Sequence, residues 1–210
     1  MNNISNPKYW NKFYKKINLT NKPSKFAKFC KNKIRNYKGI LYDMGCGNGR
    51  DTIYLNLNKI KCIGLDKSRE AIKKNKQKFV KYKNFFKKKN FCNFFLNKIE
   101  NKKFSVYSRF TIHSINYVEE KKLLKGLEKQ KNLEFVFIET RTTKDELFGV
   151  GKKIGKNEYI DTHYRRFIEP QVLKKQLSKK FKIIYYKQAK NLAKYKKENP
   201  CVLRIIAKKK

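Results

Sequence analysis

The sequence has few acidic residues, few histidines and no cysteine spacing that is typical of a metal site. Sixteen aspartate and glutamate residues stand against 55 lysine and arginine residues, which gives a formal net charge of +39. The five cysteines are widely spaced and include no Cys-x-x-Cys pair, so neither a disulfide framework nor a structural zinc site is expected. Two histidines alone cannot form a His-rich metal site, and we predict no bound metal.

Long hydrophobic runs are also missing. No apolar run approaches the roughly 18 residues that a membrane-spanning helix needs. Residues 1–14 lack the apolar core of a secretory signal, so a cytoplasmic protein is expected. Hydrophobic residues nevertheless make up 40% of the 210 residues and aromatic residues 14%, which is enough for a packed interior. The length favours one domain.

The positive charge is spread along the chain. Lysine occurs in almost every block of ten residues, whereas a nucleic-acid-binding protein usually gathers its basic residues on one face or in one tail. The abundance of Lys, Asn, Ile, Phe and Tyr also fits a drift of base composition toward A and T. The function of the charge is therefore left open. In such a genome lysine would replace arginine wherever it serves, so each of the eight arginines hints at a need for a planar guanidinium group.

Strand and helix patterns alternate through most of the chain. Short apolar runs predict strands at residues 39–44, 61–66, 84–88, 104–108, 133–138, 181–186 and 201–207. Amphipathic patterns predict helices at residues 9–14, 26–37, 50–58, 69–82, 118–131 and 170–179, with Ser68 as the N-cap of the fourth. Residues 140–168 are polar and do not fit this alternation. The pattern predicts an α/β fold with an insertion near its end.

A glycine-rich loop joins the first predicted strand to the next helix, in Asp43-x-Gly45-x-Gly47-x-Gly49. Glycine lets the backbone approach a ligand closely, and the start of a helix offers unpaired N–H groups. The spacing differs from the G-x-G-x-x-G of dinucleotide-binding folds, and no phosphate-binding G-x-x-x-x-G-K-[ST] loop occurs. Asp66 ends the next strand, where an acid can accept hydrogen bonds from a ribose. Together these features predict a cofactor site.

Through Asp43-Met44-Gly45-Cys46-Gly47-Asn48-Gly49 and Ile63-Gly64-Leu65-Asp66, the sequence resembles the class I S-adenosylmethionine-dependent methyltransferases over about residues 39–140. The resemblance implies a doubly wound, seven-stranded, mostly parallel sheet whose last strand is antiparallel. It also implies S-adenosyl-L-methionine as cofactor and S-adenosyl-L-homocysteine as product, with the glycine loop around the amino-acid end. The cofactor-binding residues that it implies are Asp43, Gly45, Cys46, Gly47, Asn48, Gly49, Asp66, Lys67, Asn90 and Phe91.

Asn90 marks a departure from that family. In many relatives an acid near the end of the third strand holds the adenine amino group, and Asn90 occupies the corresponding place. An amide oxygen can still accept a hydrogen bond. The adenine contact is therefore expected at Asn90, with an amide in place of a carboxylate.

A narrower similarity extends beyond the glycine loop. The segments are Tyr9-Trp10-x-x-Phe13-Tyr14, Gly49-Arg50-Asp51, Tyr107-Ser108-Arg109-Phe110-Thr111-Ile112-His113, Glu139-Thr140-Arg141, Asp145-Glu146-Leu147-Phe148-Gly149 and His163-Tyr164-Arg165-Arg166-Phe167. They resemble a small-molecule branch often labelled tellurite-resistance-like, some of whose members are associated with surface-polysaccharide tailoring. On this basis we expect one domain over residues 1–210. It divides into a helical lid (1–38), a cofactor-binding core (39–139), an inserted substrate cap (140–170) and a closing helix with strands (171–210).

Several arginines follow predicted strand ends or lie in the insertion, where an open α/β sheet places its ligands. Guanidinium groups match phosphate or carboxylate, so we expect a small, anionic acceptor. The expected substrate-binding residues are Tyr14, Arg109, Arg141, Tyr164, Arg165 and Arg166, and the catalytic candidates are His113, His163 and Arg109. Each arginine has the alternative of pairing with a nearby carboxylate, and each histidine that of a hydrogen-bonded pocket residue.

The sequence thus favours a methyltransferase that acts on a small anionic molecule. An alternative is an RNA methyltransferase whose basic surface supplies affinity for phosphates. A further alternative is a nucleic-acid-binding protein that kept the fold and lost catalysis, although such a protein has no use for the glycine loop and Asp66. A nucleic-acid partner is possible but not favoured. The acceptor, the methylated atom and the oligomeric state are not determined by the sequence.

Overall fold

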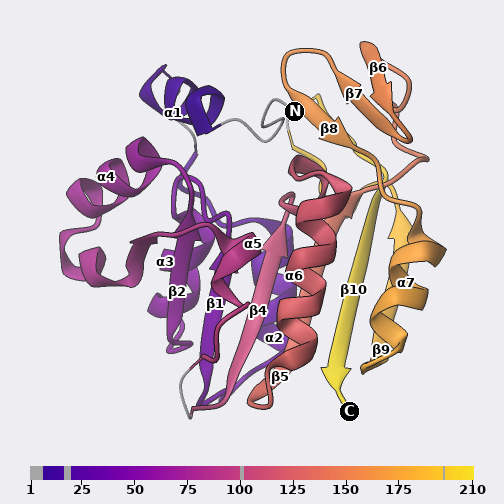
Figure 1. Cartoon of the computed structure of the whole chain (residues 1–210). Helices are drawn as coiled ribbons and strands as arrows, with labels where there is room; N and C mark the ends of the chain where they lie inside the picture. Colours follow the sequence, from indigo (N-terminus) through magenta and orange to yellow (C-terminus); the bar gives the residue numbers. More distant parts are fainter. Residues whose placement is uncertain (1–6, 17–19, 100–101, 196) are drawn as a thin grey trace.

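The computed structural model describes residues 7–16, 20–99, 102–195 and 197–210. One sheet runs through the molecule (Figure 1). Its strands are β1 (Ile40–Met44), β2 (Cys62–Asp66), β3 (Phe86–Lys88), β4 (Phe104–Arg109), β5 (Leu133–Arg141), β9 (Phe181–Ala189) and β10 (Val202–Lys209). They lie in the order β3-β2-β1-β4-β5-β10-β9, and β10 is antiparallel to both of its neighbours. The expected seven-stranded, mostly parallel sheet with an antiparallel last strand is confirmed.

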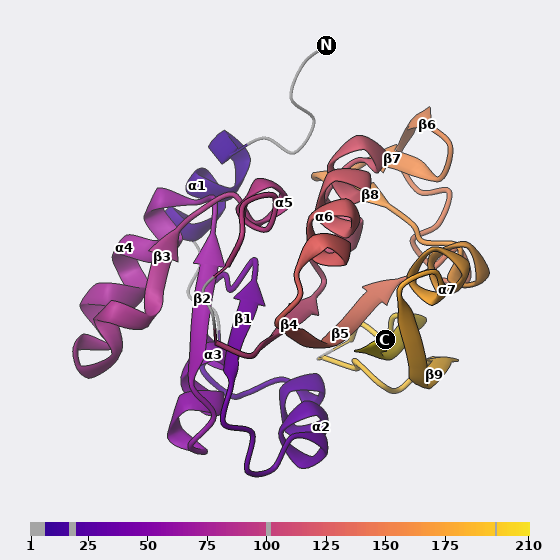
Figure 2. The ribbon, with the colours of Figure 1, turned by 60° about the horizontal axis from the view of Figure 1, so that its bottom comes forward.

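Helices cover both faces of this sheet (Figures 1 and 2). One face carries α5 (Phe91–Phe94), α6 (Tyr117–Lys129) and α7 (Pro170–Ser178), and the other carries α2 (Lys25–Lys33) and α3 (Arg50–Leu57). Two further helices, α1 (Pro7–Lys16) and α4 (Arg69–Lys78), contact each other beyond the β2 and β3 side of the sheet. Two 3₁₀ turns of the described residues, η1 (Val80–Phe85) and η2 (Ile112–Ser114), lie in the connections before β3 and after β4.

The core follows the alternation of side chains along each strand. In β1, Tyr42 and Met44 pack into the cluster under α5, α6 and α7, whereas Leu41 packs with α2 and α3. Successive strand residues point to opposite faces, so a strand buried on both sides reads as a continuous apolar run. This is why the strands were visible in the sequence as short runs rather than as alternating patterns.

The insertion forms a small antiparallel sheet of its own. Its strands are β6 (Lys152–Gly155), β7 (Glu158–Ile160) and β8 (Tyr164–Arg166), in the order β6-β7-β8. This small sheet lies above the carboxyl end of β5 and near the start of α6 (Figure 1). The carboxyl ends of the parallel strands, where such folds bind their ligands, therefore lie between α1 and the insertion.

Several expected boundaries are wrong by a few residues. The expected helix 26–37 ends at Lys33, where the chain turns through Asn36 with a φ of 62°. The expected helix 69–82 stops at Lys78 and continues as the separate turn η1. Strand β5 runs on to Arg141, so the expected cap begins inside a strand, and α5 was not expected at all. The parts of the expected lid at residues 1–6 and 17–19 lie outside the described residues.

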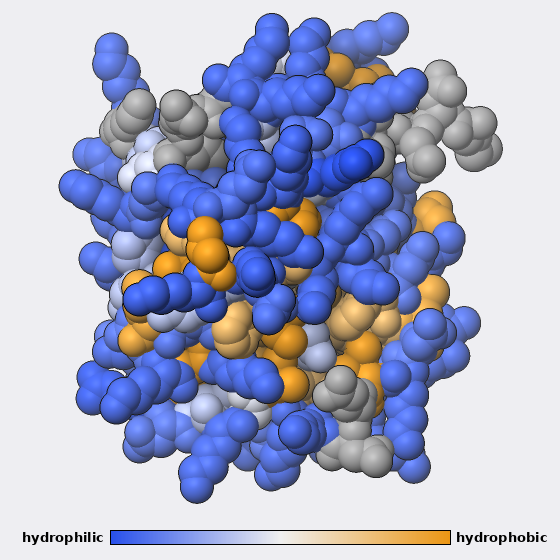
Figure 3. Space-filling view, turned by 90° about the vertical axis from the view of Figure 1, so that its left-hand side faces the viewer, coloured by the Kyte–Doolittle hydropathy of each residue, from blue (hydrophilic) through white to orange (hydrophobic). Residues whose placement is uncertain are grey.

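The surface on the side of α4 is mainly hydrophilic, with apolar side chains in small separate patches (Figure 3). Within the part of the chain that the structure describes, no helix is long and apolar enough to cross a membrane. On this side, hydrophilic side chains therefore cover an apolar core that lies on both faces of the sheet.

Candidate active site

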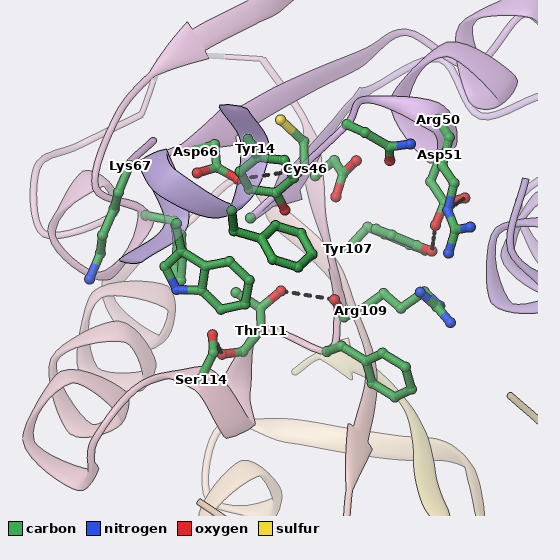
Figure 4. Close-up of a pocket in the computed structure, with 18 of the residues that line it drawn as sticks. Tyr14, Cys46, Arg50, Asp51, Asp66, Lys67, Tyr107, Arg109, Thr111 and Ser114 are labelled. Carbon is green, nitrogen blue, oxygen red and sulfur yellow. Dashed lines mark hydrogen bonds and ion pairs between the residues drawn. The ribbon is translucent and has the colours of Figure 1, made fainter. Parts of the chain in front are cut away.

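A cavity of about 280 Å³ opens at the carboxyl ends of β1, β2 and β4. The loop after β1 forms one wall, α1 lies over it, and the segment after β4 forms the opposite wall (Figure 4). The expected site residues among its lining are Tyr14, Asp43, Gly45, Cys46, Gly47, Asn48, Asp66, Lys67, Phe91 and Arg109. The local sequence patterns thus converge on one place in space.

The glycine loop has a conformation that other residues rarely adopt. Gly45, Gly47 and Gly49 have φ values of 70°, 54° and 73°. The Gly47 N–H donates to Oδ2 of Asp66 at 2.9 Å, and its carbonyl accepts from Asn75 at 2.8 Å. Left-handed backbone is unfavourable for residues with a Cβ, which explains the alternating glycines. Gly49 itself does not line the cavity but forms the N-cap of α3, packed close to the ring of Phe86.

Asp66 connects the glycine loop to the start of α4. Its second oxygen accepts from the backbone N–H of Ser68 at 2.8 Å, and Ser68 is the N-cap of α4, as expected. The carboxyl group is buried, and burial raises its pKa, although the hydrogen bonds from Ser68 and Gly47 act in the opposite direction. The carboxylate is therefore held firmly at the rim of the cavity (Figure 4).

Two more buried carboxyl groups line the same cavity. Asp51 accepts hydrogen bonds from the N–H and hydroxyl of Ser24, and from the hydroxyl of Tyr107 at 2.7 Å. Asp43 accepts from the hydroxyl of Thr52 at 2.6 Å. Burial, together with the nearby Asp51, raises the pKa of Asp43 to about 8. Carboxylates so close together favour a cationic ligand, because a positive charge would offset their mutual repulsion.

Helix α1 covers the glycine loop with aromatic side chains. Trp10, Phe13 and Tyr14 all line the cavity, and the Tyr14 hydroxyl lies close above Gly47 (Figure 4). The helix is tied to the core where the side-chain oxygen of Asn11 accepts from the hydroxyl of Ser68 at 2.8 Å. Aromatic rings at this position exclude water from the loop, as a lid would.

The far end of the cavity is closed by Lys67 rather than by Asn90. Lys67 pairs with Glu119 at 2.7 Å, and its Nζ lies 5.7 Å from the centre of the Phe91 ring. Asn90 does not line the cavity; its side chain caps α5 by accepting from the N–H of Cys92 at 3.0 Å. The side-chain oxygen of Asn90, which the expected adenine contact would need, therefore already caps α5.

Two arginines reach the cavity. Arg50 follows the glycine loop and lies 3.9 Å from Asp51. Arg109 ends β4, stacks over the ring of Phe110 at 4.4 Å and pairs through Nε with the buried Glu139 at 3.0 Å. Of the expected substrate-binding arginines, Arg109 is the one that lines the cavity, and Arg50, which was not among them, lines it as well.

The other expected substrate-binding residues lie outside this lining. Arg141 pairs with Asp145 at 2.8 Å and with Glu198 at 2.7 Å, and Arg165 pairs with Asp161 at 3.6 Å. Arg166 pairs with Glu120 and donates to the carbonyl of Ile115 at 3.2 Å; its neighbour Tyr164 has a buried hydroxyl without a hydrogen-bond partner among the described residues. Each of the four expected substrate-binding arginines therefore pairs with a nearby carboxylate, which was the alternative to binding the acceptor. These arginines are Arg109, Arg141, Arg165 and Arg166.

Neither histidine lines the cavity. His113 is buried in η2, and burial with the neighbouring Arg141 lowers its pKa well below the usual value. His163 stacks on Tyr9 at 5.3 Å, and burial with the adjacent Arg165 lowers its pKa to about 4. Both imidazoles are therefore neutral at pH 7 and can accept a proton, but a catalytic role for either stays a prediction.

The segment after β4 forms a wall of the cavity, although none of residues 110–115 was expected to bind the cofactor. Thr111 donates to the carbonyl of Met44 at 2.6 Å and so fixes this segment beside β1. The signal was its position directly after a strand at the carboxyl edge of the sheet. Tyr195, from the loop before β10, had no such signal. The lining residues outside the expected set are Trp10, Phe13, Thr20, Arg50, Asp51, Tyr107, Phe110, Thr111, Ser114, Ile115 and Tyr195.

No group of three or more His, Cys, Asp or Glu side chains is arranged to hold a metal ion in residues 7–16, 20–99, 102–195 and 197–210. The five cysteines are all buried and unpaired.

Comparison with known proteins gives the class. A family model described as a methyltransferase domain matches residues 38–160, more than half of the chain, so the chain belongs to the methyltransferase domain family. This assignment confirms the expected enzyme class. No curated protein matches significantly.

Solved structures share the fold at low sequence identity. The glycopeptide N-methyltransferase MtfA in complex with S-adenosyl-L-homocysteine superposes with a TM-score of 0.65 at 13% identity, covering 90% of each chain. The magnesium protoporphyrin IX methyltransferase ChlM from Synechocystis gives 0.65 at 14% identity, covering 88% of this chain and 80% of that one. TehB from Haemophilus influenzae gives 0.64 at 15% identity, covering 88% and 61%. The narrower branch expected from the sequence stays a prediction.

Proposed function

We propose that this methyltransferase uses S-adenosyl-L-methionine and transfers its methyl group to a small acceptor that carries an anionic group. The observation that supports this most is the combination, in one cavity, of the Gly47 and Asp66 cradle with the guanidinium of Arg109. The cofactor supplies an electrophilic methyl carbon on a positively charged sulfur. Transfer of this methyl group to the acceptor leaves S-adenosyl-L-homocysteine, whose sulfur carries no charge.

The residues present fit this cofactor. A Cβ on Gly47 would lie 2.5 Å from the Tyr14 hydroxyl, so the glycine lets Tyr14 approach the loop backbone and cover it. Asp66 stands where an acid can accept from ribose hydroxyls. Asp51 and Asp66 place carboxyl groups around a cavity that would receive a sulfonium and an ammonium group, and Asp43 can lose its proton when such a cation binds. MtfA, which shares the fold, is crystallised with both the methylated and the demethylated cofactor.

Positioning supplies most of the rate in this account. Methyl transfer needs a nucleophile in line with the breaking bond and a cavity from which water is excluded. Trp10, Phe13 and Tyr14 exclude water on the side of α1, and Arg109 with Arg50 orients an anionic group on the other side.

An acceptor that arrives deprotonated is supported by the state of the groups that could act as a base, because the three aspartates of the lining are engaged in hydrogen bonds within the fold. Among the described residues that line the cavity there is no histidine. Glu139 accepts from Arg109 at 3.0 Å and from Arg204 at 2.6 Å, so both its oxygens are engaged. An anionic oxygen needs no general base, unlike a hydroxyl. We therefore place phosphorylated and carboxylated metabolites, including the sugar phosphates used in surface-polysaccharide tailoring, first among candidate acceptors.

Transfer of a labelled methyl group to pools of phosphorylated, carboxylated and neutral metabolites tests this proposal. Label should enter an anionic pool, and Arg109→Gln should raise the KM for that acceptor. Transfer to neutral compounds alone would contradict it.

Salt separates this proposal from an RNA methyltransferase. Binding to RNA phosphates weakens steeply with ionic strength, whereas transfer to an acceptor enclosed in a cavity changes much less. Activity on RNA that collapses between low and high salt would favour the RNA enzyme. RNA binding without any cofactor binding would favour a non-catalytic binder.

A further inference from the structure

A second place for an anion lies beside the cavity, between two arginines of the insertion region. Arg141 ends β5, and its Nη2 donates to Glu198 at 2.7 Å. Arg165 lies in β8, and the segment that follows β8 pairs with the end of β5, where the Ile168 N–H donates to the Arg141 carbonyl at 3.2 Å. Burial lowers the pKa of Arg165, the Arg141 guanidinium lowers it further, and Asp161 and Glu198 act in the opposite direction. The Glu198 carboxylate therefore acts on both guanidinium groups.

The two carboxylates that pair with Arg141 differ in their exposure to solvent. Asp145 is fully buried, accepts from Nη1 at 2.8 Å and also accepts from the N–H of Leu147. Glu198 is 65% exposed and contacts Arg141 from the loop that precedes β10. A buried, multiply bonded carboxylate is a permanent partner, whereas an exposed ion pair contributes little and exchanges with competing anions.

Arg141 and Glu198 each adjoin a residue that lines the proposed active site. Phe110 lines the cavity, and its ring centre lies 5.6 Å from the guanidinium carbon of Arg141. Tyr195 also lines the cavity, and its backbone forms two hydrogen bonds with the backbone of Glu198, at 2.9 and 3.0 Å. An acceptor with its reacting atom in the cavity could therefore place a distal anionic group at Arg141.

We propose that Arg141 and Arg165 form an oxyanion subsite for the acceptor, and that the Glu198 carboxylate fills this subsite until the acceptor displaces it. This inference rests on the proposed function and deepens it, because it requires an acceptor with a phosphate or carboxylate remote from its reacting atom. Two guanidinium groups bind such oxyanions through paired N–H donors, and Glu198 imitates the ligand chemically.

The test is a gain of binding. Glu198→Gln keeps the size of the side chain and removes its charge, so inorganic phosphate should bind roughly three- to tenfold more tightly than to the unchanged protein. Titration calorimetry at constant ionic strength measures this. Arg165→Gln, which removes one arginine of the subsite and leaves the Arg141 and Asp145 pair intact, should abolish the gain when combined with Glu198→Gln.

Glu134→Gln is the matched control, because it changes the net charge equally. Glu134 pairs with Lys103 at 3.2 Å at the start of β5, at the other end of that strand from Arg141. Phosphate affinity should stay unchanged in this variant. Equal gains in Glu198→Gln and Glu134→Gln, no gain in either, or a gain that survives Arg165→Gln would each overturn the inference.

Cofactor binding separates this inference from the proposed function. Each variant is also titrated with S-adenosyl-L-homocysteine, which should bind all of them alike. Normal binding of this product without the phosphate effect overturns the subsite alone. The phosphate effect without any binding of the product overturns the proposed function and leaves the oxyanion subsite standing.

Discussion

The hydroxyl oxygen of Tyr14 lies 2.5 Å from the point that a Cβ atom on Gly47 would occupy. Helix α1 and the glycine loop therefore pack directly against each other, so a larger residue at Gly47 must displace one of them. Gly47→Ala must either push Tyr14 away or shift a loop whose φ is 54°. We expect a loss of stability of about 1–2 kcal/mol and a loss of affinity for S-adenosyl-L-homocysteine of at least about tenfold. Thermal unfolding and calorimetry measure the two effects.

Gly149→Ala is the control for this variant. Gly149 also has a positive φ, of 89°, but nothing lies within 4 Å of its absent Cβ. Gly149→Ala should therefore lose stability through backbone strain without losing affinity for S-adenosyl-L-homocysteine. Equal cofactor binding by all three proteins would contradict the role of the Gly47 cradle.

Asp43→Asn should stabilise the ligand-free protein, and more so as the pH rises. The folded-state pKa of Asp43 is raised to about 8, so the folded state keeps a proton that the unfolded state loses above its ordinary pKa near 4. Asp43 therefore makes the unchanged protein less stable as the pH rises from about 4 to about 8. An amide at this position does not titrate and causes no such loss. The gain should reach about 1–3 kcal/mol at pH 8.

The same variant should bind the cofactor less tightly at pH 8, because Asp43 can ionise beside a cationic ligand and an amide cannot. Denaturant unfolding at pH 5 and pH 8, together with titration at pH 8, checks both statements. A stability difference that does not grow with pH would show that Asp43 carries no proton in the folded protein.

Glu139→Gln should destabilise the fold strongly. The carboxylate is completely buried at the end of β5 and pairs with Arg109 and Arg204, which come from the strands on either side. Its removal leaves two guanidinium groups without their common partner, so a loss of about 3–5 kcal/mol is expected. Chemical denaturation measures it, with the partly exposed Glu134→Gln as a control that should cost less than about 1 kcal/mol. A small effect at Glu139 would mean that solvent replaces the carboxylate.

His163 should make the protein sensitive to acid. Its folded-state pKa is lowered to about 4, whereas the unfolded state takes up a proton near the ordinary value of 6.5. Stability therefore falls as the pH drops from about 6.5 to 4, and His163→Asn should flatten that part of the profile. Melting temperatures of the two proteins across this range provide the comparison. Parallel profiles would contradict the depressed pKa.

The parts of the site that could be predicted from sequence are those written in a local pattern. A strand, alternating glycines and a helix specify the loop at Gly45 to Gly49, and the spacing to Asp66 specifies its partner on the next strand. The cap of Ser68 follows from its own position before a helix. Each of these needs only a short stretch of chain to be recognised.

Partners distant in the sequence could not be read in this way. Arg141 meets Glu198 across 57 residues and Arg166 meets Glu120 across 46, so only the fold shows that these arginines are occupied. Tyr195 reaches the cavity from a loop without any motif. Helix α4 was expected to be longer because Phe79 and Tyr82 continue its apolar spacing; the structure uses these residues to pack against the cluster around Phe86 instead.

Asp66 should carry much of the affinity of the cavity for the methyl-donor cofactor. Calorimetric titration with S-adenosyl-L-homocysteine of the unchanged protein, Asp66→Asn and the charge-matched Glu134→Gln measures this. Asp66 offers a carboxylate where two hydroxyl donors would bind, so its loss should weaken binding by roughly 100-fold, while the control binds normally. Equal affinity in all three proteins, or no saturable binding by the unchanged protein, would contradict the account.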